Sequence, residues 1–106
     1  MKSFNIRDFK DGWFIGNFLP SIHQTKEFEV SFKHFKKEDR EPKHFQKIAS
    51  EITLVISGKI RLGDNFFEKG KIILIFPDEE AEFECIEECE VICIKFPSIP
   101  GDKIIS

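Results

Sequence analysis

One stretch, residues 44–58, limits the possible folds of this chain more than any other. Its sequence is HFQKIASEITLVISG, in which polar or small residues alternate with large aliphatic residues from position 51 onwards. Successive side chains of a β-strand point to opposite faces, so the alternation predicts a strand with two different faces. One face carries Glu51, Thr53, Val55 and Ser57, and the other carries Ile52, Leu54 and Ile56. A strand that is apolar on its outer side must be covered there by a second sheet or by another subunit.

The same stretch predicts a polar site. His44 and Gln46 are two residues apart and therefore share one face of a strand, and Glu51 begins the alternating run that follows. We expect these three side chains to point into one cavity. An imidazole, an amide and a carboxylate in that arrangement can bind a small polar molecule or a divalent metal.

The spacing of these residues resembles the first sequence motif of the cupins, which are small double-stranded β-helix (jelly-roll) barrels. In that motif two His residues, two positions apart, and a Glu beyond a short gap bind a divalent metal, and a Gly follows at a turn. His44 stands at the first His position and Gln46 at the second, while Glu51 and Gly58 keep the spacing from Glu to Gly. The resemblance covers residues 25–97 and implies an all-β fold, a jelly-roll cupin barrel.

The second cupin motif begins at Gly70, and Pro77 lies at the turn that follows. The position of the family's third metal-binding His is occupied by Ala81. The alternation of residues 81–86 agrees with this count, because Ala81 shares a face with Phe83 and leaves Glu82 on the other face. We therefore expect Ala81 to line the cavity and Glu82 to lie outside it.

The resemblance implies a metal held by His44, Gln46 and Glu51. An amide oxygen is a weaker, neutral ligand than an imidazole, and the third His is missing, so we expect either no cofactor or a weakly bound divalent metal. Two kinds of function stay open. The first is binding of a small polar molecule, such as a sugar, in the barrel. The second is a metal-dependent enzyme, a dioxygenase or an isomerase or epimerase, or a metal-free isomerase in which His44 and Glu51 exchange protons with a substrate.

A second alternating run, residues 26–35, places His34 on the same face as Phe28, Val30 and Phe32. We expect that face to point into the core, which makes His34 either a hydrogen-bonded core or rim histidine or a cavity residue near His44. Five large apolar residues, 72–76, predict a strand buried on both faces.

The length of 106 residues suits one domain, which by size scaling buries roughly two-thirds of the surface of its unfolded chain. We divide it into an aromatic-rich N-terminal arm (1–24), a barrel core (25–97) and a C-terminal tail without a core pattern (98–106). Trp13, in the arm, is expected either to anchor the core or an interface, or to stack on a ligand. The apolar outer faces at residues 52–56 and 72–76 predict a homodimer.

Composition excludes several partners. The net charge is −3, with both signs mixed among the charged residues, so there is no basic field for nucleic acid. The longest apolar run is too short to span a bilayer and the N-terminus has no long apolar stretch, so we expect a cytoplasmic protein with no membrane partner.

The three cysteines, Cys85, Cys89 and Cys93, are odd in number and spaced four residues apart. This predicts free thiols rather than disulfides or a zinc site.

Overall fold

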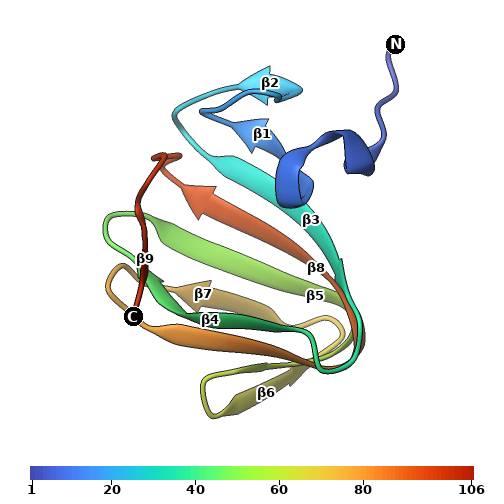
Figure 1. Ribbon diagram of the computed structural model, residues 1–106, viewed down its shortest axis with the longest axis vertical. Helices are drawn as coiled ribbons and strands as arrows, with labels where there is room; N and C mark the ends of the chain where they lie inside the picture. Colours follow the sequence, from blue (N-terminus) through green and yellow to red (C-terminus); the bar gives the residue numbers. More distant parts are fainter.

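The computed structural model describes all 106 residues and is built almost entirely from strands (Figure 1). The elements are η1 (Ile6–Asp8), η2 (Lys10–Gly12), β1 (Trp13–Gly16), β2 (His23–Gln24), β3 (Glu29–Phe35), β4 (Arg40–Gln46), β5 (Ser50–Leu62), β6 (Asn65–Glu68), β7 (Ile72–Ile75), β8 (Ala81–Phe96) and β9 (Lys103–Ile105). The two helical elements are single 3-10 turns, and no helix has the length and apolar character needed to cross a membrane.

Two layers of strands face each other, and the long strands β5 and β8 run through both. Sheet I has the order β2-β1-β3-β8-β5-β7 and uses the second half of β8 and the first half of β5. Sheet II has the order β9-β4-β8-β5-β6 and uses the other halves. The sheet does not close into a complete hydrogen-bonded circuit. This all-β, double-stranded β-helix architecture is the one predicted from the sequence.

Gly58 marks the bend of β5 from sheet I into sheet II. Its φ is +78°, and a Cβ at this position would collide with the carbonyl oxygen of Glu88 and lie 2.8 Å from the Cα of Cys89. Only glycine fits this close approach without strain. The pairing of β5 with β8 continues past this bend through shifts in register, so each of the two remains one long strand.

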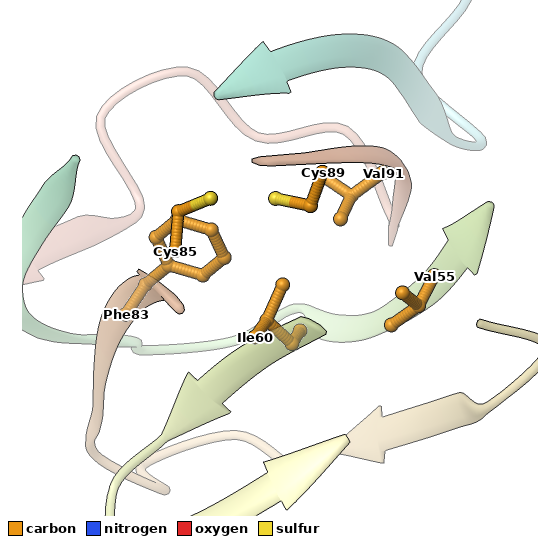
Figure 2. Close-up of a cluster of buried hydrophobic side chains, with 6 residues drawn as sticks. All are labelled: Val55, Ile60, Phe83, Cys85, Cys89 and Val91. Atoms are coloured by element: carbon orange, nitrogen blue, oxygen red, sulfur yellow. The ribbon is translucent and has the colours of Figure 1, made fainter. Parts of the chain in front are cut away.

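The hydrophobic core lies between the two sheets near this bend (Figure 2). Its six buried residues come from β5 and β8: Val55, Ile60, Phe83, Cys85, Cys89 and Val91. Phe35 of β3 adds to the cluster with its ring 4.6 Å from the ring of Phe83. The three cysteines are free, as predicted, and two of them belong to this core.

The faces of β3 are opposite to those predicted. Ser31 is fully buried and Lys33 lines a cavity between the sheets, whereas Phe32 lies on the outer face. The reason is the N-terminal arm, since η1 and η2 pack over the outside of β3 and place Phe9 near Phe32. The apolar outer residues of β3 are therefore covered by the chain's own first residues.

The prediction that residues 72–76 are buried on both faces is wrong. Ile75 is buried, whereas Ile72 is 68% exposed and Leu74 is 47% exposed. Strand β7 lies at the edge of sheet I and packs against the interior on one side only. Its apolar outer side chains face solvent in the single chain.

The C-terminal segment, expected to be a tail, folds back as β9 and pairs with β4. Asp102 fixes its start, because its carboxylate accepts hydrogen bonds from the backbone N–H groups of Ile48 and Ala49, each at 2.9 Å. No strand pattern is recognisable in this segment because β9 has only three residues, all of them exposed.

Candidate functional site

A cavity of about 450 Å³ lies between the sheets, beside the core cluster. Apolar side chains from both sheets form one part of its wall: Phe35, Leu62, Ile75, Phe83 and Val91. Charged and polar side chains form the other part: Asp11, Lys33, Glu41, His44, Glu51, Thr53, Lys95 and Lys103. Trp13, Ala81 and Cys93 complete the lining.

His44 enters the cavity from β4. Its Nδ1 lies 2.8 Å from the carbonyl oxygen of Pro42, so Nδ1–H donates this bond and Nε2 is left without a partner. Burial lowers the pKa of His44, the Pro42 hydrogen bond opposes this, and the charge of Lys103 adds to the lowering. A neutral imidazole with a free acceptor nitrogen therefore faces the cavity at pH 7.

Glu51 enters from β5, in register with Lys95 on β8. Burial raises the pKa of Glu51 above its ordinary value, and the positive charge of Lys95 partly opposes this. The carboxyl group forms neither a hydrogen bond nor an ion pair within the chain, which leaves it available to a bound molecule.

Three lysines and Trp13 complete the polar wall. Lys33 pairs with Glu41 at 3.6 Å, whereas Lys95 and Lys103 form no ion pair. The Nζ atoms of Lys33 and Lys95 lie 5.2 and 4.8 Å from the ring centroid of Trp13, within the range of a cation–π contact.

Gln46 follows His44 on β4 but does not reach the cavity. Its side chain is 5% exposed and lines an adjoining hollow of about 110 Å³, and its Nε2 has no hydrogen-bond partner. Lys95 and Lys103 line both the hollow and the cavity. The C-terminal segment covers Gln46, because Lys103 of β9 pairs with it.

No family model and no curated protein matches the sequence, but solved structures match the fold. An RmlC-like cupin from Shewanella frigidimarina aligns over 72% of this chain and 71% of its own, with 15% identity and a TM-score of 0.64. A protein with a double-stranded β-helix domain from Klebsiella pneumoniae aligns over 99% of this chain and 91% of its own, with 15% identity and a TM-score of 0.73. KdgF from Halomonas sp. aligns over 71% and 74%, with 14% identity and a TM-score of 0.66. The chain has the cupin fold.

Within the cupin fold, the structure brings together three of the five site residues named from the sequence. His44, Glu51 and Ala81 line the same cavity, and Glu82 points away from it toward Arg61, at 3.3 Å. The residues named for a metal, His44, Gln46 and Glu51, are divided between the cavity and the hollow. No three His, Cys, Asp or Glu side chains are grouped in the way that would hold a metal ion.

The fourth residue, Gln46, lies in the hollow, and the fifth, His34, lies outside the cupin barrel. The prediction that His34 points toward the core or cavity is wrong. It is exposed on the outer side of β3, and its Nε2 lies 2.7 Å from a carboxylate oxygen of Glu88. It follows the inverted faces of β3, on which Lys33 takes the inward position.

The lysines and Trp13 are the cavity residues that the sequence did not identify as a group. A signal existed for Lys95, which alternates with Val91 and Cys93 on the inward face of β8. For Lys33 the signal was hidden by the phenylalanines beside it, and for Lys103 there was none. In this cupin fold the polar wall therefore depends on the arm and the C-terminal strand, which lie outside the two motifs.

Proposed function

We propose that this protein binds a small polar molecule, such as a sugar or a related metabolite, in the cavity and without a metal. The observation that carries the proposal is a cavity of about 450 Å³ in which charged groups converge on an otherwise apolar wall. Small-molecule sites typically have this size, roughly 300 to 1,000 Å³, and this mixture of surfaces. The binding groups would be His44, Glu51 and the lysines, with Ala81 leaving room where the cupin resemblance places a ligand for a metal.

Each polar group has a definite capacity. His44 Nε2 accepts a hydrogen bond from a hydroxyl group. Glu51 donates when protonated and accepts when ionised. Trp13 lines the cavity and would supply an aromatic surface for an apolar part of the molecule. A molecule with hydroxyl groups on one side and a hydrocarbon side opposite matches this arrangement.

A metal-dependent dioxygenase, isomerase or epimerase is the alternative function. It is favoured by the bond from His44 Nδ1 to a backbone carbonyl, which is the usual way to orient an imidazole toward a metal. Of the three residues named for a metal, however, only His44 and Glu51 share the cavity, and Lys95 and Lys103 place positive charge beside them. This residue set fits a divalent cation poorly, so no step of a reaction is assigned to one. Elemental analysis of the purified protein separates the two functions, since one first-row metal per chain would favour the alternative.

Ligand binding is tested with a panel of small polar metabolites and the melting temperature of the protein. A compound that binds the folded state raises the melting temperature with its concentration. We expect at least one compound to do so, and we expect Ala81→Phe to abolish the effect by filling the cavity. Ile86→Phe adds the same ring on the outward face of the same strand and should leave binding intact. A panel without any binder, or unchanged binding by Ala81→Phe, would contradict the proposal.

We also propose that the protein works in the cytoplasm as a homodimer. The three free thiols support a reducing compartment. The support for a dimer is the outer face of sheet I, on which Ile72 and Leu74 are apolar and exposed in the single chain.

A further inference from the structure

Lys95 and Lys103 are the cavity cations that form no ion pair, although Lys95 contacts the ring of Trp13. Lys33, the third lysine, already pairs with Glu41, and no carboxylate lies within ion-pair distance of the other two. Both also line the small hollow next to the cavity, so the two residues lie where the two spaces meet. An unpaired ammonium group in a partly closed site favours an anion.

The hollow adds a third donor. Gln46 is buried, with only 5% of its surface exposed, and its Nε2 has no hydrogen-bond acceptor. A buried N–H group without an acceptor is costly, and such groups in native proteins commonly mark a missing partner.

The acidic side chains of the hollow bond to other groups and not to Gln46. Glu29 accepts a hydrogen bond from the hydroxyl of Ser98 at 3.0 Å. Asp102 accepts bonds from the backbone N–H groups of Ile48 and Ala49. This leaves three donors without an acceptor in the chain, Nζ of the two lysines and Nε2 of Gln46.

We infer that the molecule bound in the cavity carries an anionic oxygen group, a carboxylate or a phosphate, which Lys95, Lys103 and Gln46 hold at the junction with the hollow. The inference rests on the proposed function and names the chemical class of its ligand. The remainder of the molecule would extend along Trp13 toward His44 and Glu51. A neutral sugar would leave the three donors unsatisfied and should bind weakly.

Matched pairs of probes test the inference in the wild-type protein. Trp13 is the only tryptophan and lines the cavity, so its fluorescence reports occupancy directly. Gluconate is compared with glucitol, which lacks the carboxylate, and glucose 6-phosphate with glucose. We expect the anionic member of at least one pair to bind about tenfold or more tightly than its neutral twin. The pair that responds distinguishes a carboxylate from a phosphate.

Two substitutions locate the bound anion, and a third serves as their control. Lys95→Met and Lys103→Met keep the length of the side chain and remove its charge, and each should weaken the anionic probe about tenfold or more. The neutral twin should be unaffected. Lys43→Met is the control, because Lys43 lies on β4 outside the cavity and pairs with Glu80 at 3.1 Å.

The outcomes separate this inference from the proposed function. Equal binding of charged and neutral twins, or unchanged anion binding by both cavity variants, overturns the inference and leaves the cavity as a binding site. If neutral metabolites from the panel bind but none of the four probes does, the inference is likewise overturned and the cavity remains a binding site. The absence of any binder, charged or neutral, overturns both.

Discussion

The outer faces of the two sheets differ sharply in chemistry. On sheet II, Arg61 bonds to Glu82 at 3.3 Å and to Glu84 at 3.1 Å, and Arg40 reaches Glu84 from the neighbouring strand at 3.2 Å. On sheet I, two successive outward positions on each of four adjacent strands carry apolar side chains. Both faces belong to the same two long strands, β5 and β8, so the change occurs along each strand at the bend near Gly58.

The apolar face of sheet I consists of two rows of side chains in register across β3, β8, β5 and β7. One row is Val30, Ile94, Ile52 and Leu74, and the other is Phe32, Ile92, Leu54 and Ile72. The N-terminal arm covers the β3 end, at Phe32. The β7 end stays exposed, with 68% of Ile72 and 47% of Leu74 accessible.

The comparison teaches that the sheet II face is suited to water and that part of the sheet I face is not. Contiguous apolar surface of this kind commonly marks an interface in soluble proteins. A partner must itself be uncharged where it covers the rows, and a second copy of the same face meets that condition. A two-fold axis makes one patch complementary to itself. We therefore propose that two chains pack through sheet I and leave the sheet II faces in solvent.

The largest predicted effect is the loss of this dimer. Leu54→Asp places a charge in the centre of the face, and Ile72→Lys places one at its exposed edge, where folding should be unaffected. Light scattering at micromolar concentration should give twice the chain mass for wild type and 12.4 kDa for both variants. Glu82→Ala, on the sheet II face, should remain dimeric. A wild-type mass of 12.4 kDa would contradict the proposal, and the arm would then be the only cover of sheet I.

The second prediction concerns the bend that joins the two sheets. Gly58→Ala combines a left-handed φ with a collision against the backbone of β8, and we expect a loss of about 2–5 kcal/mol in the free energy of unfolding. Gly63→Ala is the matched control, because Gly63 has a φ of +59° but nothing within 4 Å of the added Cβ. Its loss should be about 1 kcal/mol, from the backbone conformation alone. Equal losses in urea denaturation would show that the contact with β8 is unimportant.

Much of this fold could be predicted from the sequence. The alternation in residues 51–57 fixed which side chains of β5 face inward, and Glu51 and Thr53 line the cavity accordingly. The count from Gly70 placed Ala81 on the inner face. Both inferences depend only on the period of a strand and on positions within a motif.

The faces of β3 and the burial of β7 could not be predicted, because they depend on which surfaces other parts of the chain cover. Phe28, Val30 and Phe32 indicated an inward face, but the arm covers Phe32 from outside, so Lys33 and not His34 enters the cavity. The burial expected for β7 failed because no element covers its outer side within one chain. Periodicity identifies two faces of a strand, but it does not say which one the remote ends of the chain will cover.

The third prediction concerns Glu51, on the inner face, where burial raises the pKa. The folded state therefore holds this proton more tightly than the unfolded chain, and stability falls as pH rises from the unfolded pKa, about 4.3, through the folded one. Glu51→Gln removes the ionisable group, so it should stabilise the protein at pH 7 and have little effect near pH 4. Denaturant titrations at both pH values measure this difference. Glu27→Gln, at an exposed position, is the control for the loss of a carboxylate, and a Glu51→Gln effect equal at both pH values would contradict the expected burial.

The last prediction concerns the rate at which a thiol reagent modifies the cysteines inside the barrel. It involves no change in stability or in assembly. Burial raises the pKa of Cys93 to about 11 and that of Cys89 to about 12, the latter with help from Cys85 beside it. At pH 8 a thiol with a pKa of 11 is about 0.1% thiolate, against roughly a quarter for a free cysteine, so the thiolate fraction alone slows its reaction about 200-fold. We expect a thiol-specific reagent to modify the cysteines slowly in the folded protein and all three at once in urea.

Cys93 lines the cavity, so Cys93→Ala should remove the fastest of the slow reactions, and a saturating cavity ligand should slow that reaction further in the wild-type protein. Rapid modification of one thiol in the native protein would show that the interior near β8 opens more readily than its packing indicates.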